Sequence, residues 1–228
     1  NEPTLQTLLA EISPILIGQK FGRIFPLSRL TLAIDFRLNE GNYLFISLES
    51  SAPRIYLIKR RLRDLEKQSV NPHPFYLLLR KKLSNAILQT ITKDENERII
   101  RLKLTAIDEI EGQKKYTFVV QLTGRSANLF LLDENDFIID SLRENEGEGQ
   151  TIGSRFSSPI RQNQRQNIGE EIVFPQGEAE TLSEALDLYY QQLEAEKVFQ
   201  SQAKNAQAKL RQEISKRQKL QNKLQKDL

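Results

Sequence analysis

The fold is decided by residues 98–142, which read RIIRLKLTAIDEIEGQKKYTFVVQLTGRSANLFLLDENDFIIDSL. β-Branched and aromatic residues dominate four runs of this stretch, as is typical of strands. An acidic turn at 133–136 joins the last two runs, and turns of this length form antiparallel hairpins. The expected strands are 98–106, 116–122, 128–132 and 137–142.

The preceding residues extend the same antiparallel pattern, because their connections are too short to hold crossover helices. Apolar residues with helical spacing predict one short helix on each side of the first strands. The expected elements are a helix from an N-cap at Thr4 to about Gly18, strands at 20–25, 30–37, 43–48 and 54–58, a helix at 75–83 and a strand at 86–92. The fold class is therefore α+β: a mainly antiparallel β domain with two short helices.

After residue 142 the chain becomes polar and glycine-rich, which predicts a linker. Thr181 and Glu184 form a capping-box signature, and neither glycine nor proline follows before residue 228. This pattern predicts a long helix whose thin apolar seam needs a partner, so we expect one arm of a coiled coil. The chain is then a fragment divided into a domain at 1–145, a linker at 146–177 and a truncated arm at 178–228.

Composition excludes several classes of protein. With 228 residues, 39% hydrophobic and 28% charged, the chain is neither collagen-like nor fully disordered. Cysteine is absent, which excludes disulfides, thiolate zinc sites and a cysteine nucleophile, and fits a reducing compartment. No apolar run has the length of a membrane span, so no membrane partner is expected.

The net charge of +3 is unevenly distributed. From Phe199 onward, eight Lys or Arg residues accompany two acids, whereas the rest of the chain is mildly acidic. A basic exposed helix attracts phosphate groups, although a merely solvated face fits the same pattern. The candidate RNA contacts on such surfaces are Arg80, Lys204, Lys209, Arg211, Lys216, Arg217 and Lys219.

Residues suited to catalysis are scarce. His73, the single histidine, lies between two prolines with no serine or carboxylate motif beside it, which favours a structural role. The acids at 133–136 suit turn geometry better than a metal site, and the glycines near residue 150 lack the lysine of a phosphate loop. We therefore expect no enzyme activity, metal or cofactor.

Two local patterns leave binding open. Glu97 and Arg98 lie at the start of a predicted strand, and this pattern fits either a surface ion pair or a binding site. Gly124 and Arg125 belong to a turn that suits phosphate contacts but also any tight hairpin.

The order of several sequence blocks resembles the NFACT-N domain of the fibronectin-binding protein A, RqcH and NEMF family of ribosome quality control. The blocks are LIG at 16–18, GRIFP at 22–26, APRIYL at 52–57, PFYLLLRKKL at 74–83, ERII at 97–100, LTGRSAN at 122–128 and FIIDS at 137–141. This resemblance covers about residues 4–145 and implies a fold similar to the amino-terminal domain of formamidopyrimidine-DNA glycosylases. It also implies that a helix-hairpin-helix domain is missing from 146–177 and that an NFACT-R domain belongs to the family's full chain.

The resemblance implies a function in the cytoplasm. Family members bind large ribosomal subunits obstructed by peptidyl-tRNA and recruit tRNA, alanyl-tRNA in bacteria, so that a carboxy-terminal tail is added to the stalled chain. The family's Asp-Arg pair falls on Glu97-Arg98, and its Glu-Ile-Met patch falls on residues 121–123. The implied tRNA-binding residues are Glu97, Arg98, Gln121, Leu122, Thr123, Gly124 and Arg125. The alternative from the same family is a surface adhesin that binds fibronectin or fibrinogen.

Overall fold

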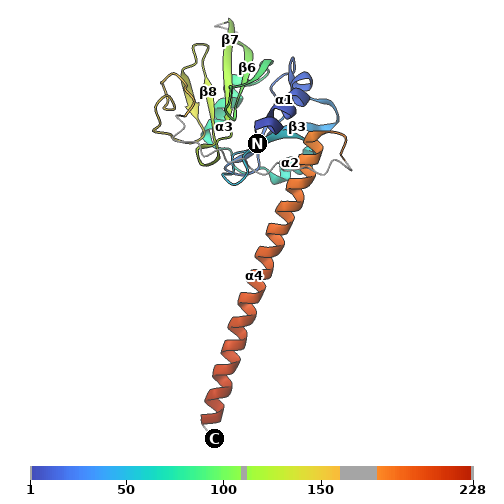
Figure 1. The fold of residues 1–228 in the computed structure, drawn as a ribbon, viewed down its shortest axis with the longest axis vertical. Coiled ribbons are helices and arrows are strands. Elements are labelled where there is room, and N and C mark those ends of the chain that lie inside the picture. The colour runs from blue at the N-terminus through green and yellow to red at the C-terminus, as the bar shows by residue number, and fades with distance from the viewer. Residues whose placement is uncertain (1, 109–111, 160–178, 227–228) are drawn as a thin grey trace. The chain divides into compact units, whose positions relative to one another are not determined.

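The computed structural model describes residues 2–108, 112–159 and 179–226. The chain divides into two compact units, Asn1–Ala185 and Leu186–Leu228. The first unit holds two antiparallel sheets and three short helices, and the second holds most of one long helix (Figure 1). The predicted α+β class with a long C-terminal helix is confirmed.

The first sheet has four strands in sequence order, each antiparallel to the next. Most residues of its central strands are buried, which explains why these strands are almost continuously apolar rather than alternating. Helix α1 (Glu2–Leu16) precedes the sheet and buries one apolar stripe. The strands are β1 (Ile24–Pro26), β2 (Thr31–Ile34), β3 (Asn42–Ser47) and β4 (Arg54–Lys59).

Two helices link the sheets, of which only the second was predicted. Helix α2 (Leu62–Gln68) escaped prediction because it buries one residue, Leu65, and so shows no apolar periodicity. Helix α3 (Pro74–Leu83) begins with proline and buries Phe75, Tyr76, Leu79 and Leu83. His73 has the structural role expected of it: its Nδ1 accepts the Phe75 N–H at 3.2 Å and caps α3.

The second sheet contains five strands, again in sequence order and antiparallel throughout. Its core includes Ile99, Val119, Phe130 and Phe156, and the rings of Phe130 and Phe156 meet edge to face. The strands are β5 (Ile87–Lys93), β6 (Ile99–Asp108), β7 (Gly112–Gln121), β8 (Asn128–Leu132) and β9 (Ile138–Ser141).

Several predicted boundaries need correction. The strand expected at 20–25 is shorter, because Lys20 makes only an isolated bridge to Ile87 before β1 begins. Thr4 lies inside α1 rather than at its N-cap. The Gly18 stop is confirmed, since that residue has a φ of +85° just after the helix ends.

The expected linker begins later than residue 146. Phe156 is buried in the core of the second sheet, and Gln150 is 2% exposed. Arg155 pairs with Phe137, and the Ile138 N–H donates to the Ser154 carbonyl at 2.9 Å. Residues 146–159 therefore belong to the first unit, and the remainder of the expected linker, 160–177, lies outside the described residues.

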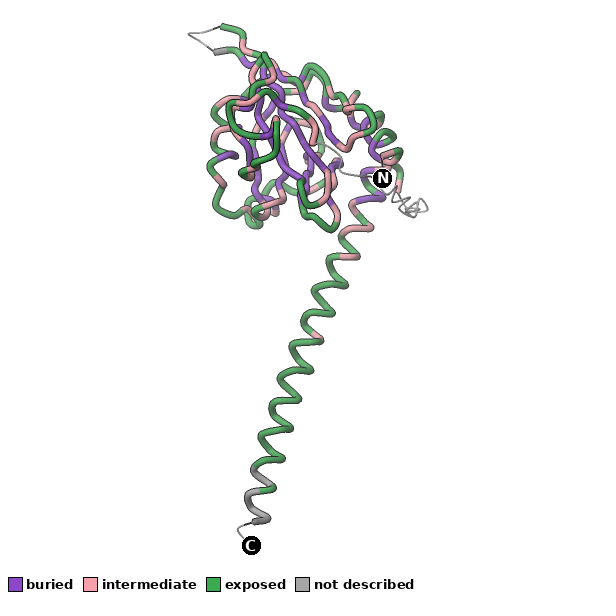
Figure 2. The backbone as a smooth tube through the Cα atoms, turned by 60° about the vertical axis from the view of Figure 1, so that its left-hand side comes forward, coloured by how far each residue is buried: buried purple, intermediate pink, exposed green. Residues whose placement is uncertain are grey.

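Helix α4 (Leu182–Lys226) has 45 residues and contributes everything described in the second unit. The capping box is confirmed in its first half, because the Glu184 N–H donates to Thr181 Oγ1 at 3.2 Å. Figure 2 shows the helix exposed along most of its length. Its apolar residues Phe199, Leu210 and Ile214 are exposed. The long helix is confirmed, while its pairing into a coiled coil stays a prediction.

Candidate nucleic-acid interface

Strand register brings the two predicted groups of tRNA-binding residues together. Ile99 at the start of β6 pairs with Gln121 at the end of β7, and the Leu122 N–H donates to the Arg98 carbonyl at 2.8 Å. Glu97 and Arg98 therefore lie beside the turn that follows β7. Two patterns that are far apart in the sequence form one end of the five-stranded sheet.

Arg98 also joins the two sheets. Its Nη2 donates to the Pro53 carbonyl at 2.9 Å, and Pro53 immediately precedes β4 in the other sheet. The side chain is half-buried in this position. Arg98 therefore stabilises the fold at the candidate site, and replacing it would disturb both the sheet junction and any contact with a ligand.

The adjacent turn presents a more exposed cation. Residues Gly124–Ser126 form a short 3-10 helix, and Gly124 has a φ of +66°, a backbone conformation that favours glycine. The hydroxyls of Thr123 and Ser126 lie 2.9 Å apart and brace the turn. Arg125 is exposed, and its side chain makes no ion pair with the residues that the structure describes. Arg125 is thus the cation of this turn best able to reach a phosphate.

Gln121 and Leu122 lie beneath the turn instead of on its surface. Both side chains are buried. Gln121 Nε2 donates to the Ser126 carbonyl at 2.6 Å, and its Oε1 accepts the Gln150 Nε2 at 2.9 Å. These two side chains hold the turn from within, so a ligand at this surface would meet Thr123, Gly124 and Arg125.

Arg143 is a second arginine at this turn, and sequence reasoning missed it. Its Nη1 donates to the Ala127 carbonyl at 3.2 Å and lies 3.5 Å from the Arg125 carbonyl. The Asn128 side chain bridges to the Arg143 backbone from the start of β8. Arg143 reaches the turn because the ends of β8 and β9 pair with each other, and no local sequence motif indicates this long-range pairing.

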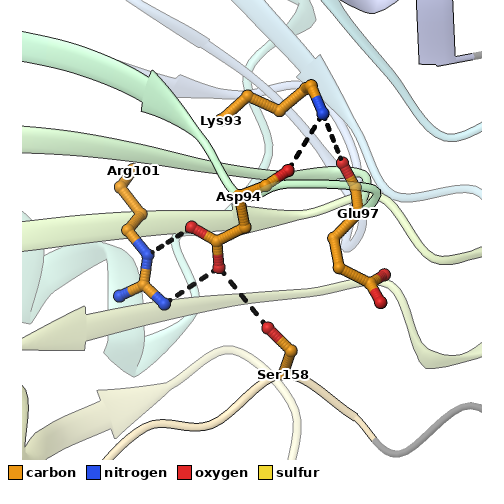
Figure 3. Close-up of polar contacts among 5 residues, drawn as sticks. All are labelled: Lys93, Asp94, Glu97, Arg101 and Ser158. Atoms are coloured by element: carbon orange, nitrogen blue, oxygen red, sulfur yellow. Dashed lines mark hydrogen bonds and ion pairs between the residues drawn. The ribbon is translucent and has the colours of Figure 1, made fainter.

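A partly buried ion pair stands next to Glu97 (Figure 3). The two Asp94 oxygens accept Arg101 Nε and Nη2 at 2.7 and 2.9 Å, and each side chain is 20% exposed. The Ser158 hydroxyl donates to the same carboxylate at 3.4 Å, while the Arg101 guanidinium lies 5.0 Å from the centre of the Phe156 ring. Asp94 therefore ties the β5–β6 turn to the segment after β9.

Lys93 fixes the other side of that turn. Its ammonium donates to the carbonyls of Asp94 and Glu97 at 2.9 and 3.3 Å (Figure 3). It also pairs with the Glu2 carboxylate at 2.7 Å. The Lys93 side chain is 11% exposed, so Lys93 stabilises the turn from within and is not a surface cation. The hydrogen bond from Lys93 to the Glu97 carbonyl thereby fixes the backbone position from which the Glu97 side chain extends.

The other predicted RNA contacts lie elsewhere. Arg80 is exposed on α3, where it lines a cavity with Arg23 of the first sheet. The predicted α4 cations, at 204, 209, 211, 216, 217 and 219, are all exposed in the second unit. Over the described ranges, no three His, Cys, Asp or Glu side chains converge as a metal site would require, and none of the helices could span a membrane.

Curated relatives share part of this chain. It is 27% identical over 133 residues to the Rqc2 homolog RqcH of Streptococcus suis, a match that covers 58% of this chain and 23% of the relative. A protein of the same name from Streptococcus pneumoniae strain D39 is 23% identical over 162 residues, covering 68% and 29%. The chain thus spans less than a third of the length of these relatives.

Solved structures share its fold. The N-terminal domain of the fibronectin-binding protein PavA from Streptococcus pneumoniae has a TM-score of 0.59 at 22% identity, over 69% of this chain and 60% of that one. The N-terminal part of the fibronectin/fibrinogen-binding protein from Streptococcus suis has a TM-score of 0.60 at 24% identity, over 70% of this chain and 61% of that one. The family model for the NFACT N-terminal and middle domains matches residues 3–154, and the chain therefore belongs to the NFACT family.

Proposed function

We propose that this protein binds tRNA on obstructed large ribosomal subunits and supports the carboxy-terminal tailing of stalled nascent chains. One observation carries the proposal: the Leu122 N–H to Arg98 carbonyl bond sets Glu97 and Arg98 beside Gly124 and Arg125 at one end of the second sheet. Membership in the NFACT family and the relatives named Rqc2 homolog RqcH support a ribosomal setting.

The chemistry proposed for this surface is positioning rather than covalent catalysis. The exposed guanidinium of Arg125 would contact tRNA phosphates, because arginine donates several charge-assisted hydrogen bonds in a fixed geometry. The Glu97 carboxylate would accept from base or sugar donors nearby. Buried Gln121 holds the turn in shape, so its neutral amide in place of the family's acid would act indirectly. No cofactor enters this scheme, and the setting is cytoplasmic.

Arg125→Gln gives a cleaner test than any change at Arg98. The Arg125 side chain is exposed, whereas Arg98 also bonds to Pro53, so Arg98→Ala would confound binding with the sheet junction. We expect Arg125→Gln to weaken tRNA association with purified obstructed subunits about tenfold, the value of one charge-assisted contact. The measurement is filter binding of labelled tRNA to the complex of subunit and protein.

The matched control is Arg155→Gln, which removes an exposed arginine from the segment packed on the same sheet. Thermal melts would establish that both variants fold like the parent. Equal tRNA binding by Arg125→Gln and the parent protein would remove the turn from the proposed site.

The alternative function is adhesion to host matrix. Structural neighbours that are named fibronectin-binding or fibrinogen-binding proteins support this candidate. Fractionation of cells producing the full protein discriminates the two, because an adhesin must be recovered from the cell surface and a quality-control factor from ribosomes. Recovery at the surface alone, with saturable binding to immobilised fibronectin, would favour the adhesin.

A further inference from the structure

The first unit carries a basic region apart from the candidate tRNA surface. Residues 59–82 contain eight Lys or Arg and two acids, a net charge of +6, whereas the whole of Asn1–Ala185 has a net charge of −1. The other residues of the unit thus sum to −7. A local concentration of cations on an otherwise acidic body is the electrostatic footprint of a polyanion partner.

The basic region is exposed and built on helices. Arg63 and Lys67 lie four residues apart on α2 and share one face of it, while Arg80 and Lys81 are exposed in the last turn of α3. Arg61 is exposed just before α2. Of these cations, Arg80 lies beside β1 of the first sheet, whereas the candidate tRNA surface belongs to the end of the second sheet.

A cavity of about 310 Å³ opens within this region. Its walls come from β1, from the C-terminal end of α2 and from α3, and they combine apolar with charged groups. Pro26 and Val70 supply apolar surface, and the Val70 side chain is 47% exposed. Arg23 and Arg80 supply the cations. This volume lies near the small end of ligand pockets, a size that suits a single nucleotide.

The cations are held in usable positions. Arg23 Nη1 pairs with Glu66 Oε1 at 2.9 Å, and its guanidinium lies 5.0 Å from the centre of the Phe25 ring. Both members of this pair are about half exposed, so the pair is weak and the arginine can exchange its partner. The Arg80 side chain makes no ion pair with the described part of the chain. The cavity thus offers two guanidinium groups beside an apolar wall.

Tyr76 forms a rigid, neutral part of the wall. Burial raises the pKa of its hydroxyl, which therefore stays protonated at neutral pH. That hydroxyl lies 3.4 Å from the Arg29 carbonyl, to which it donates. A neutral tyrosine adds no negative charge that would repel a phosphate.

We propose that this cavity binds one unstacked nucleotide of a single-stranded RNA, with Arg23 and Arg80 on its phosphate and the base against Pro26 and Val70. The surrounding helices then contact the flanking phosphates through their lysines and arginines. Glu66 opposes binding, because its carboxylate competes with the phosphate for Arg23. The proposal takes RNA as the polyanion from the proposed function, and it assigns a second surface that the tRNA residues do not include.

The test uses the whole chain and a short fluorescent oligouridine, with affinity measured by anisotropy over a range of salt concentrations. Arg80→Gln should raise Kd about tenfold and reduce the slope of log affinity against log salt by about one. Glu66→Gln should lower Kd, since it frees Arg23. Val70→Trp fills the cavity without changing charge and should raise Kd for the oligouridine but not for a duplex of equal length.

Matched controls distinguish binding in the cavity from nonspecific electrostatic attraction to the whole protein. Arg155→Gln and Glu134→Gln change charge by the same amounts at exposed positions on the second sheet and should leave Kd nearly unchanged. All five positions are exposed, so the variants should melt like the parent.

Two results would overturn the proposal. One is equal weakening by Arg80→Gln and Arg155→Gln, which a diffuse field would produce. The other is unchanged oligouridine binding by Val70→Trp, which would mean that no base enters the cavity. Neither result bears on Arg125→Gln, so the tRNA surface stands or fails separately.

Discussion

At the residue scale, the turn at 94–98 is built from charges that satisfy one another. The Asp94 carboxylate accepts hydrogen bonds from Arg101 Nε and Nη2 and from Ser158, and Lys93 donates to the carbonyls of Asp94 and Glu97. Such a partly buried pair costs desolvation to form, but it leaves an uncompensated charge when one partner is lost. Asp94, Arg101 and Lys93 therefore stabilise the turn at the candidate site, and we do not expect them to contact a ligand directly.

Asp94→Asn tests that support. We expect it to lower the free energy of unfolding by about 2 kcal/mol, because Arg101 would keep its burial and lose its carboxylate. Urea unfolding provides the measurement. Glu66→Gln breaks an exposed pair of similar length and should cost about 0–1 kcal/mol. Similar losses for the two variants would show that burial of the Asp94 pair contributes nothing.

At the element scale, a side chain from α1 caps the start of α4. The Glu11 carboxylate accepts the Leu182 N–H at 2.7 Å and the Ser183 N–H at 3.1 Å. The Ser183 hydroxyl in turn accepts the Leu57 N–H at 3.2 Å, on the edge strand β4. An anion at a helix N-terminus satisfies donors that no helical bond reaches and complements the helix dipole.

Glu11→Ala should destabilise the first turn of α4 by about 1–2 kcal/mol, the usual cost of losing a charged cap. Amide hydrogen exchange at Leu182 and Ser183 would then quicken while exchange in the β6–β7 core stays slow. Glu40→Ala, which removes an exposed acid paired with Lys59, is the control. Unchanged exchange at the two amides would mean that the cap is dispensable.

The sequence predicted what local patterns encode and missed what long-range contacts create. Alternation and turn residues located nearly every strand, and the block at 122–128 identified the turn of the candidate site. Helix α2 was missed because it buries only Leu65, and the place of Gln121 was missed because its partner Gln150 is 29 residues away. The polar, glycine-rich run after residue 142 suggested a linker, yet Phe156 packs in the core and Gln150 donates to buried Gln121.

At the scale of the whole molecule, the two units are stabilised by different interactions. The first unit has two sheets and a continuous core. In the second unit Phe199, Leu210 and Ile214 are exposed, and the ion pair Arg217 to Glu213 is a weak surface contact at 3.6 Å. The exposed part of a helix depends on helix propensity and on side-chain pairs, so that part unfolds gradually.

Heating this chain should therefore give two transitions. Far-ultraviolet circular dichroism should lose helical signal broadly at low temperature as α4 frays, because no packed face makes its melting cooperative. Near-ultraviolet dichroism from the buried Tyr56 and Tyr76 should change later, in one cooperative step of the first unit. Removal of residues 201–228 should abolish most of the early change and leave the later step in place. Coincident transitions by both probes, or an early transition that rises in temperature with protein concentration, would instead mean that the apolar seam of α4 is packed against another helix.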